Sequence, residues 1–125
     1  MKTLRIGIAN YEDMKSRTLA IAKGDIKTSK DEPKLWFTSI DSLARVLSDK
    51  NRALLNLIIE QKPGSLSELE SISGRAKSNL SRTLKNMSKF GLVTLTKGSG
   101  GTITPSVPYG KINLDLSLVI PAKDL

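Results

Sequence analysis

Cationic, amide and hydroxyl side chains gather in one stretch of this chain, between residues 75 and 99. Arginine can donate two parallel hydrogen bonds to the edge of a guanine, and asparagine can pair in the same way with adenine. Lysine and serine can reach phosphates or base edges. The ten side chains that we expect to contact a nucleic acid are Arg75, Lys77, Ser78, Asn79, Ser81, Arg82, Lys85, Lys89, Lys97 and Ser99.

A helix over about residues 76–90 is the element that must position most of these side chains. A helix turns by about 100° per residue, so Leu80, Leu84 and Met87 fall on one side of it. The opposite side carries no acid and consists of Arg75, Ser78, Arg82, Lys85 and Lys89. We expect base contacts from Lys77, Ser78, Asn79, Ser81 and Arg82, and phosphate contacts from Arg75, Lys85 and Lys89. For each residue taken alone, a solvated helix surface is the alternative.

A shorter helix precedes this one and begins with a capping signal. Ser65 and Glu68 have the spacing of a capping box, in which the two side chains accept hydrogen bonds from the first free N–H groups. We expect the helix to run to about Ser73, with Gly74 as the turn that follows. Its apolar residues, which should be buried, are Leu66, Leu69 and Ile72.

A β-hairpin is expected after the second helix. Gly91 is suited to the left-handed conformation that ends many helices, and residues 92–97 then alternate in the manner of a strand. Residues 98–101, Gly-Ser-Gly-Gly, form a tip, and residues 102–104 can pair back. Lys97 and Ser99 would then lie where they can touch a nucleic-acid backbone, although a plain hairpin loop is the alternative.

Before the helix pair, the sequence predicts one strand and three helices. Residues 3–9 alternate as a half-buried strand, and Asn10 caps a helix that runs to about Lys23. Residues 25–34 are polar and read as a linker. Thr38 or Ser39 opens the next helix, and Asp49 can cap a mostly buried central helix over residues 50–61. The aromatic pair before the first of these two helices, Trp36-Phe37, fits core packing or, alternatively, an exposed anchor for a partner.

The clearest strand pattern lies near the C-terminus. Pro105 and Pro108 should mark the exit from the hairpin, and residues 111–120 then alternate between apolar and polar side chains. This strand and the N-terminal strand can pair with each other or across a dimer.

The composition excludes several classes of function. The chain has 125 residues and contains neither cysteine nor histidine, which removes the usual zinc ligands, the thiolate nucleophile and the histidine general base. We therefore expect no enzymatic activity, no metal and no cofactor. The N-terminus does not resemble a targeting signal, and no apolar run approaches the roughly 20 residues of a membrane span. The expected location is cytoplasmic, without a membrane partner.

The net charge is +8, and its distribution favours a polyanionic partner. Residues 62–98 hold seven lysines and arginines against Glu68 and Glu70, which is a net +5. Both acids lie in the shorter helix, away from the basic side of the second helix. The charge therefore concentrates where the nucleic-acid contacts are expected.

At residues 78–95, SNLSRTLKNMSKFGLVTL, the chain resembles winged helix-turn-helix transcriptional regulators of the broad MarR/ArsR type. Ser81-Arg82-x-Leu84 followed by Phe90-Gly91-Leu92-Val93 is similar to the passage from recognition helix to wing in that family. The resemblance covers residues 50–104 and implies binding of double-stranded DNA through the second helix. The long dimer helices of the first type and the metal ligands of the second are missing.

The flanking strands and the Trp36 to Ser39 segment resemble small prokaryotic DNA-binding proteins that are paired with toxins. That resemblance implies a homodimer that represses its own promoter and binds a small toxin protein as an antitoxin.

Patterns and resemblance together predict an α+β fold, a winged helix-turn-helix core with additional N- and C-terminal β-strands. The expected ranges are an arm and linker at 1–34, the DNA-binding domain at 35–104 and a C-terminal strand at 105–125. The expected function is sequence-specific binding of double-stranded DNA, as a transcriptional repressor. Two alternatives stay open, which are a protein-interaction module that neutralises a partner and an RNA-binding protein. The aromatic content of 4% weighs against the RNA alternative.

Overall fold

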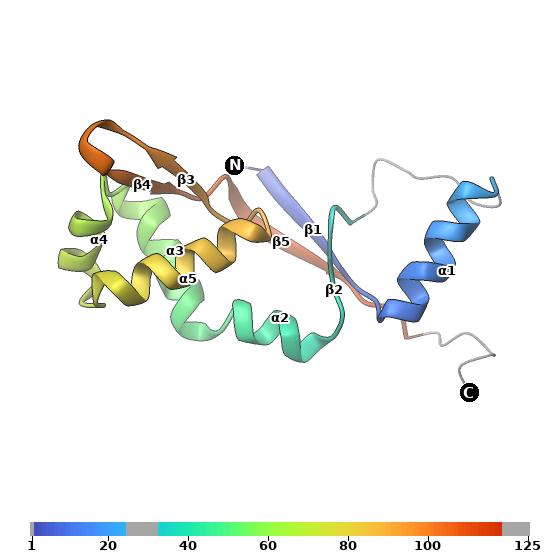
Figure 1. Cartoon of the computed structure of the whole chain (residues 1–125). Helices are drawn as coiled ribbons and strands as arrows, with labels where there is room; N and C mark the ends of the chain where they lie inside the picture. The colour runs from blue at the N-terminus through green and yellow to red at the C-terminus, as the bar shows by residue number, and fades with distance from the viewer. Residues whose placement is uncertain (1, 25–32, 119–125) are drawn as a thin grey trace. The chain divides into compact units, whose positions relative to one another are not determined.

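A computed structural model describes residues 2–24 and 33–118, and Figure 1 shows the helices α1–α5 and strands β1–β5 found in them. The fold is therefore a mixture of α-helices and β-strands. The described residues separate into two compact units. The helix-hairpin unit contains residues 46–110 together with Lys2, and the three-stranded unit contains the remaining described residues. The first unit thus begins at residue 46, whereas the sequence suggested a boundary at residue 35.

The helix-hairpin unit packs three helices against a two-stranded hairpin (Figure 1). Its elements are α3 (Asp49–Gln61), α4 (Leu66–Ser73), α5 (Lys77–Lys89), β3 (Thr94–Lys97), the 3-10 turn η1 (Ser99–Gly101) and β4 (Ile103–Ser106). Helix α4 contacts α5, strand β3 contacts α5, and strand β4 contacts both α3 and α4. The buried apolar core is formed by Leu54, Leu55, Ile58, Leu66, Leu69, Leu80, Leu84, Met87, Leu92 and Val93.

Helix α3 starts one residue earlier than predicted. The Ser48 hydroxyl accepts a hydrogen bond from the Asn51 N–H at 3.3 Å, so Ser48 is the N-cap and Asp49 is the first helical residue. The expectation of a mostly buried helix is also only partly met, because its buried residues are Leu54, Leu55 and Ile58. They form one side of the helix, and the remainder of its circumference is half-buried or exposed.

Helix α4 confirms its predicted cap and corrects one core residue. The Ser65 hydroxyl accepts from the Glu68 N–H at 3.0 Å, and the Glu68 carboxylate accepts from the Gly64 N–H at 2.9 Å. Ile72, however, is 41% exposed, so its predicted burial is wrong. Steps of three residues drift by about 60° around a helix, which carries Ile72 about 120° away from Leu66 and out of the core.

The end of helix α5 follows the predicted glycine signal. The N–H groups of Gly91 and Leu92 donate to the carbonyl oxygens of Ser88 and Met87, which is the hydrogen-bond pattern of a Schellman cap. Gly91 has a φ of 78°, a conformation that glycine adopts without the steric cost of a side chain. The chain therefore turns sharply from α5 into the hairpin.

The hairpin is longer than predicted. Strand β4 extends to Ser106 and pairs antiparallel with β3, and Pro105 lies opposite Leu95. The expectation that Pro105 marks the exit is wrong. Proline cannot donate a backbone hydrogen bond, but in a two-stranded sheet each strand has a free edge where no donor is needed.

The three-stranded unit joins both ends of the described chain in one sheet. Its elements are β1 (Lys2–Ile8), α1 (Tyr11–Ala22), β2 (Leu35–Phe37), α2 (Ile40–Val46) and β5 (Tyr109–Asp115), and the strand order is β2-β1-β5. Of the two predicted pairings for the terminal strands, the one within the chain is therefore present. The Arg5 guanidinium reinforces it with a 2.9 Å contact to the Asp115 carboxylate.

Strand β2 was not predicted, and it explains the aromatic pair. It pairs parallel with β1, so that Phe37 lies opposite Ile8 and is 3% exposed. Trp36 lies opposite Gly7, and a methyl group at Gly7 would approach the indole ring to 2.3 Å. The packing alternative is thus confirmed for this pair. Three residues are too few for a recognisable alternation, which is why the sequence did not reveal the strand.

The other predicted elements of this unit are close to their expected ranges. The Asn10 side chain accepts from the Asp13 N–H at 2.8 Å and caps α1, and the Ser39 hydroxyl accepts from the Ser42 N–H at 3.1 Å at the start of α2. Strand β5 ends at Asp115, earlier than predicted, and residues 119 and 120 lie outside the described residues. The linker prediction falls mainly on residues 25–32, which are also outside them. None of the described helices has the length and apolarity needed to cross a bilayer.

Candidate nucleic-acid interface

Helix α5 separates apolar and polar residues into two opposite faces, as its sequence period requires. Leu80 and Leu84 are fully buried and Met87 is 1% exposed, so this face fixes the helix against the core. The exposed side chains are Lys77, Ser78, Arg82, Lys85, Asn86 and Lys89, while Asn79, Ser81 and Thr83 are half-buried. The core packing therefore holds Arg82 and Lys85 in solvent on a rigid element.

The outward face of α5 borders a hollow of about 720 Å³. The residues around it are Asn51, Ser78, Ser81, Arg82, Thr83, Lys85, Asn86, Met87 and Lys89. Five of the ten predicted contact residues, Ser78, Ser81, Arg82, Lys85 and Lys89, thus line one continuous surface. That surface carries three cations and no acid, which suits hydrogen bonding to an anionic ligand.

Arg75 is not part of this surface, and its predicted place on the outward strip is wrong. Helix α5 starts after the N-cap Ala76, so Arg75 lies in the turn and the helical period does not apply to it. Its guanidinium donates to the Asn79 carbonyl oxygen from Nε at 3.0 Å and from Nη2 at 2.7 Å. Nη2 also donates to the Thr83 hydroxyl at 3.3 Å, and Nη1 lies 3.5 Å from the Asn51 carbonyl oxygen. Arg75 therefore links α5 to α3.

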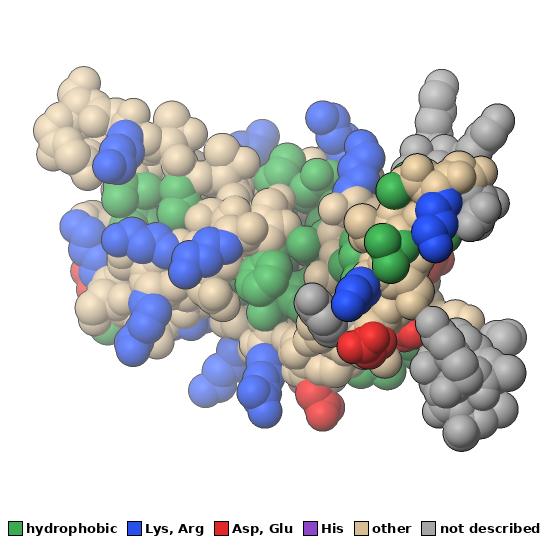
Figure 2. Space-filling view, turned by 45° about the vertical axis from the view of Figure 1, so that its right-hand side comes forward, with side chains coloured by type: hydrophobic (Ala, Val, Ile, Leu, Met, Phe, Trp, Pro, Cys, Tyr) green, Lys and Arg blue, Asp and Glu red, His purple; other side chains and the backbone are tan. Residues whose placement is uncertain are grey.

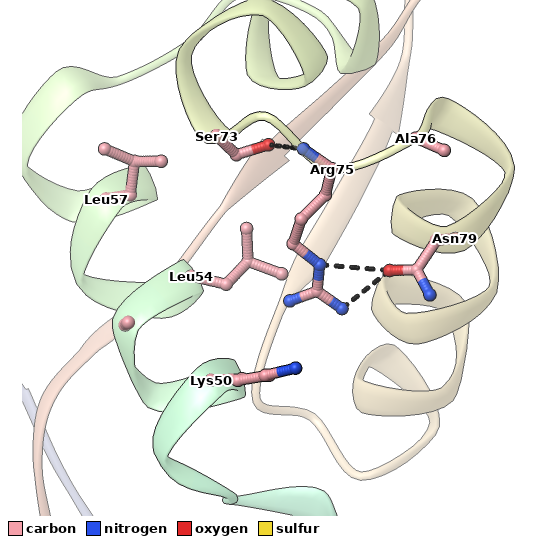
Figure 3. A pocket seen from close by; sticks show the side chains of 8 residues that line it. Lys50, Leu54, Leu57, Ser73, Arg75, Ala76 and Asn79 are labelled. Carbon is pink, nitrogen blue, oxygen red and sulfur yellow. Dashed lines mark hydrogen bonds between the residues drawn. The ribbon is translucent and has the colours of Figure 1, made fainter.

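A second hollow, of about 660 Å³, lies beside this link between α3 and the turn before α5. Figure 3 shows Arg75 extending across it toward Asn79, with Lys50 and the apolar side chains of Leu54 and Leu57 on the α3 side. The Asn79 carbonyl oxygen faces the guanidinium, whereas its amide nitrogen points away (Figure 3). A predicted base reader is thus held in place by Arg75.

Lys77 is directed toward α4. Its Nζ donates to the Ser67 hydroxyl at 3.0 Å, and its backbone N–H donates to the Glu70 carboxylate at 2.8 Å. Ala76 has no side chain that can cap the helix, so Glu70 supplies an acceptor at the positive end of α5. These two bonds fix the angle between α4 and α5 across the Gly74 turn.

The hairpin is held close to the start of α4. The Thr104 hydroxyl donates to the Gly64 carbonyl oxygen at 2.8 Å, and a hollow of about 150 Å³ lies between residues 65–67, Lys77 and residues 100–103. Lys97 and Ser99 are both exposed near the tip. The two predicted hairpin contacts are therefore accessible, and the tip lies beside the helix pair.

The electrostatics of α5 favour an anion. In the part of the chain that the structure describes, no carboxylate forms an ion pair with Arg82, Lys85 or Lys89. Figure 2 shows Lys and Arg side chains gathered on the left of the visible face, where acidic side chains are few. Among the described residues, no group of three carboxylates could hold a metal ion.

Sequence reasoning missed three residues of this region. Asn51 lines the hollow beside α5 and also contacts Arg75, and Thr83 accepts from Arg75. Lys50 lines the second hollow. Asn51 and Lys50 are about 25 residues distant from Arg75 along the chain, so no periodic signal could link them. Thr83 lies on α5 itself and could have been identified from its position two turns after Arg75.

Comparisons with known proteins give one match. Neither the curated proteins nor the solved structures contain a match to this chain. A family model described as HVO_A0114 matches residues 46–114, a range that includes the whole of α3, α4, α5 and the hairpin. Because this match spans more than half of the 125 residues, the chain belongs to the HVO_A0114 family.

Proposed function

We propose that this chain is a sequence-specific, double-stranded DNA-binding transcriptional regulator whose helix-hairpin unit acts as a winged helix-turn-helix. One observation carries the proposal, which is the exposed face of α5 with Arg82, Lys85 and Lys89 and no paired carboxylate. A helix of this width fits the major groove of B-form DNA. The buried Leu80 and Leu84 on its other side hold it rigidly enough to dock as a unit.

The arrangement assigns separate roles to the parts of the interface. Ser78, Ser81 and Arg82 lie toward the N-terminal half of α5 and contact base edges, while Lys85 and Lys89 contact phosphates. Lys97 and Ser99 on the hairpin contact the flanking backbone. Arg75 holds Asn79 in position. Repression follows when the bound protein occupies a promoter, and no chemical step is required.

The test is fluorescence anisotropy with labelled duplex DNA at several salt concentrations. The duplexes are the DNA upstream of the protein's own gene and a scrambled version of it. A specific regulator should prefer its site by a factor of about 1,000 or more. A double variant, Arg82→Ala with Lys85→Ala, should lower affinity and reduce the salt slope by about 1.8, since each lost phosphate contact contributes about 0.9.

The matched control is Lys15→Ala with Lys23→Ala, which removes the same charge from exposed positions in and directly after α1. This pair should leave both the site preference and most of the salt slope intact. If the two double variants weaken binding equally, net charge alone attracts DNA and α5 is not the recognition helix. If neither changes it, the protein-interaction alternative, with a toxin or another protein as partner, replaces this proposal.

A further inference from the structure

Strand β5 leaves one of its edges without a partner strand in the described residues. The sheet order β2-β1-β5 places β1 on one side of it and no described strand on the other. Apolar side chains at and beyond the end of this strand are also exposed, with Leu114 at 46%, Leu116 at 42% and Leu118 at 89%. A free strand edge beside exposed leucines readily accepts another strand.

The sequence of β5 is complementary to itself in one antiparallel register. Successive side chains alternate between faces, so Lys111, Asn113 and Asp115 share one face and Ile112 and Leu114 share the other. When Asn113 lies opposite Asn113 of a second copy, Lys111 lies opposite Asp115 of that copy, and the twofold axis repeats the pair. On the other face, Ile112 lies opposite Leu114 of the second copy.

Neighbouring registers lose this match. Moving the centre by one residue toward either end places Lys111 opposite Asn113 or Ser117 of the second copy and removes both charge pairs. The contact between Arg5 and Asp115 holds the Asp115 carboxylate on the sheet. A carboxylate accepts several hydrogen bonds, so Asp115 can serve Arg5 and a lysine of a second copy together.

From this self-complementarity we infer that two copies of the chain associate through antiparallel pairing of β5 about Asn113. The two sheets then form one continuous sheet in the order β2-β1-β5-β5-β1-β2. Leu114, Leu116 and Leu118 lie along the shared edge and lose exposure on association. All the residues that carry this inference belong to the three-stranded unit or follow β5, so it does not depend on DNA binding by α5.

The chain has no cysteine, which makes single-cysteine variants of the full-length protein a direct test. In the inferred register the two Asn113 side chains face each other, at the Cβ separation of about 4.5–5.5 Å typical of cross-strand pairs. Asn113→Cys should therefore form a disulfide-linked dimer under mild oxidation. The matched control is Ser117→Cys, because in extended strands the two copies of this position lie about 26 Å apart along the sheet. Cross-linking of Asn113→Cys should exceed that of the control at least tenfold on non-reducing gels.

Sedimentation equilibrium supplies a second measurement that needs no cysteine. The unmodified protein should sediment at twice the 13.6 kDa mass of the chain, and Leu114→Asp should raise the dimer dissociation constant by about tenfold or more, because it buries a charge at the joint. Ile72→Asp is the matched control, since Ile72 is similarly exposed but lies on α4, and it should change the constant less than twofold.

Circular dichroism of each variant checks that it is folded. A monomeric unmodified protein without cross-linking at Asn113→Cys would overturn the inference. A dimer that cross-links more through Ser117→Cys than through Asn113→Cys would overturn the register. Both measurements are made without DNA, so their failure is separate from a failure of the proposed function.

Discussion

Arg75 and Arg82 offer a comparison of one substitution at two positions that the sequence placed on the same helix face. The structure separates them, because Arg75 is half-buried and linked to three neighbours while Arg82 is exposed. We predict that Arg75→Ala lowers the stability of the protein and that Arg82→Ala does not. The direct effect of Arg82→Ala falls on DNA binding.

The size of the Arg75 effect follows from its contacts. The two bonds to the Asn79 carbonyl oxygen, at 3.0 and 2.7 Å, share one acceptor, the bond to Thr83 is 3.3 Å long, and the 3.5 Å contact with Asn51 contributes little. Hydrogen bonds to charged groups contribute about 1.5–3 kcal/mol each when buried, and half-exposure reduces this. We expect Arg75→Ala to lower the free energy of unfolding by about 2 kcal/mol in total. Arg82→Ala should stay within about 0.5 kcal/mol of the unmodified protein.

Thermal unfolding followed by circular dichroism measures both. For a chain of this length, 2 kcal/mol corresponds to a fall in Tm of about 8 °C, and 0.5 kcal/mol to about 2 °C. Arg75→Lys should recover little of the loss, since an ammonium group cannot present two donors to Asn79 as the guanidinium does. DNA binding measured at a temperature where all variants are folded should weaken more for Arg82→Ala than for Arg75→Ala.

One pattern of results would refute this reasoning. If Arg75→Ala leaves Tm unchanged and weakens DNA binding as strongly as Arg82→Ala, the contacts with Asn79 and Thr83 do not stabilise the fold. Arg75 would then belong to the outward strip, as the helical period alone suggested.

Three further changes test local features of the fold by their effect on the free energy of unfolding in urea. Gly7→Ala should cost about 1–3 kcal/mol, because the added methyl group meets the Trp36 ring at 2.3 Å; the double variant with Trp36→Leu should recover part of the loss, and a neutral single variant would show that Trp36 does not pack there. Ser65→Ala should cost about 1 kcal/mol by removing the cap that Glu68 N–H uses, whereas Ser71→Ala, at an exposed position of α4, should cost less; equal losses would contradict the capping role. Gly91→Ala should cost about 1 kcal/mol, because its φ is 78° with no atom near enough to clash, so a stabilising effect would show that the backbone does not keep this conformation.

The sequence by itself determined the local structure of the helix pair. The Ser65 and Glu68 cap, the Gly74 turn and the Gly91 cap each depend on residues within a few positions of one another, so their signals are complete in the sequence. The same holds for the burial of Leu80 and Leu84, because a helix of known period has only one apolar face.

Tertiary structure alone decided what depends on distant segments. The link between Arg75 and Asn51 joins residues 24 positions apart, and it turns a side chain away from the strip that periodicity assigned to it. Strand β2 exists because β1 pairs with it, although its three residues carry no periodic signal. Helical period and capping act over a few residues and can be read directly, whereas pairing partners and the direction of long side chains depend on which segments meet.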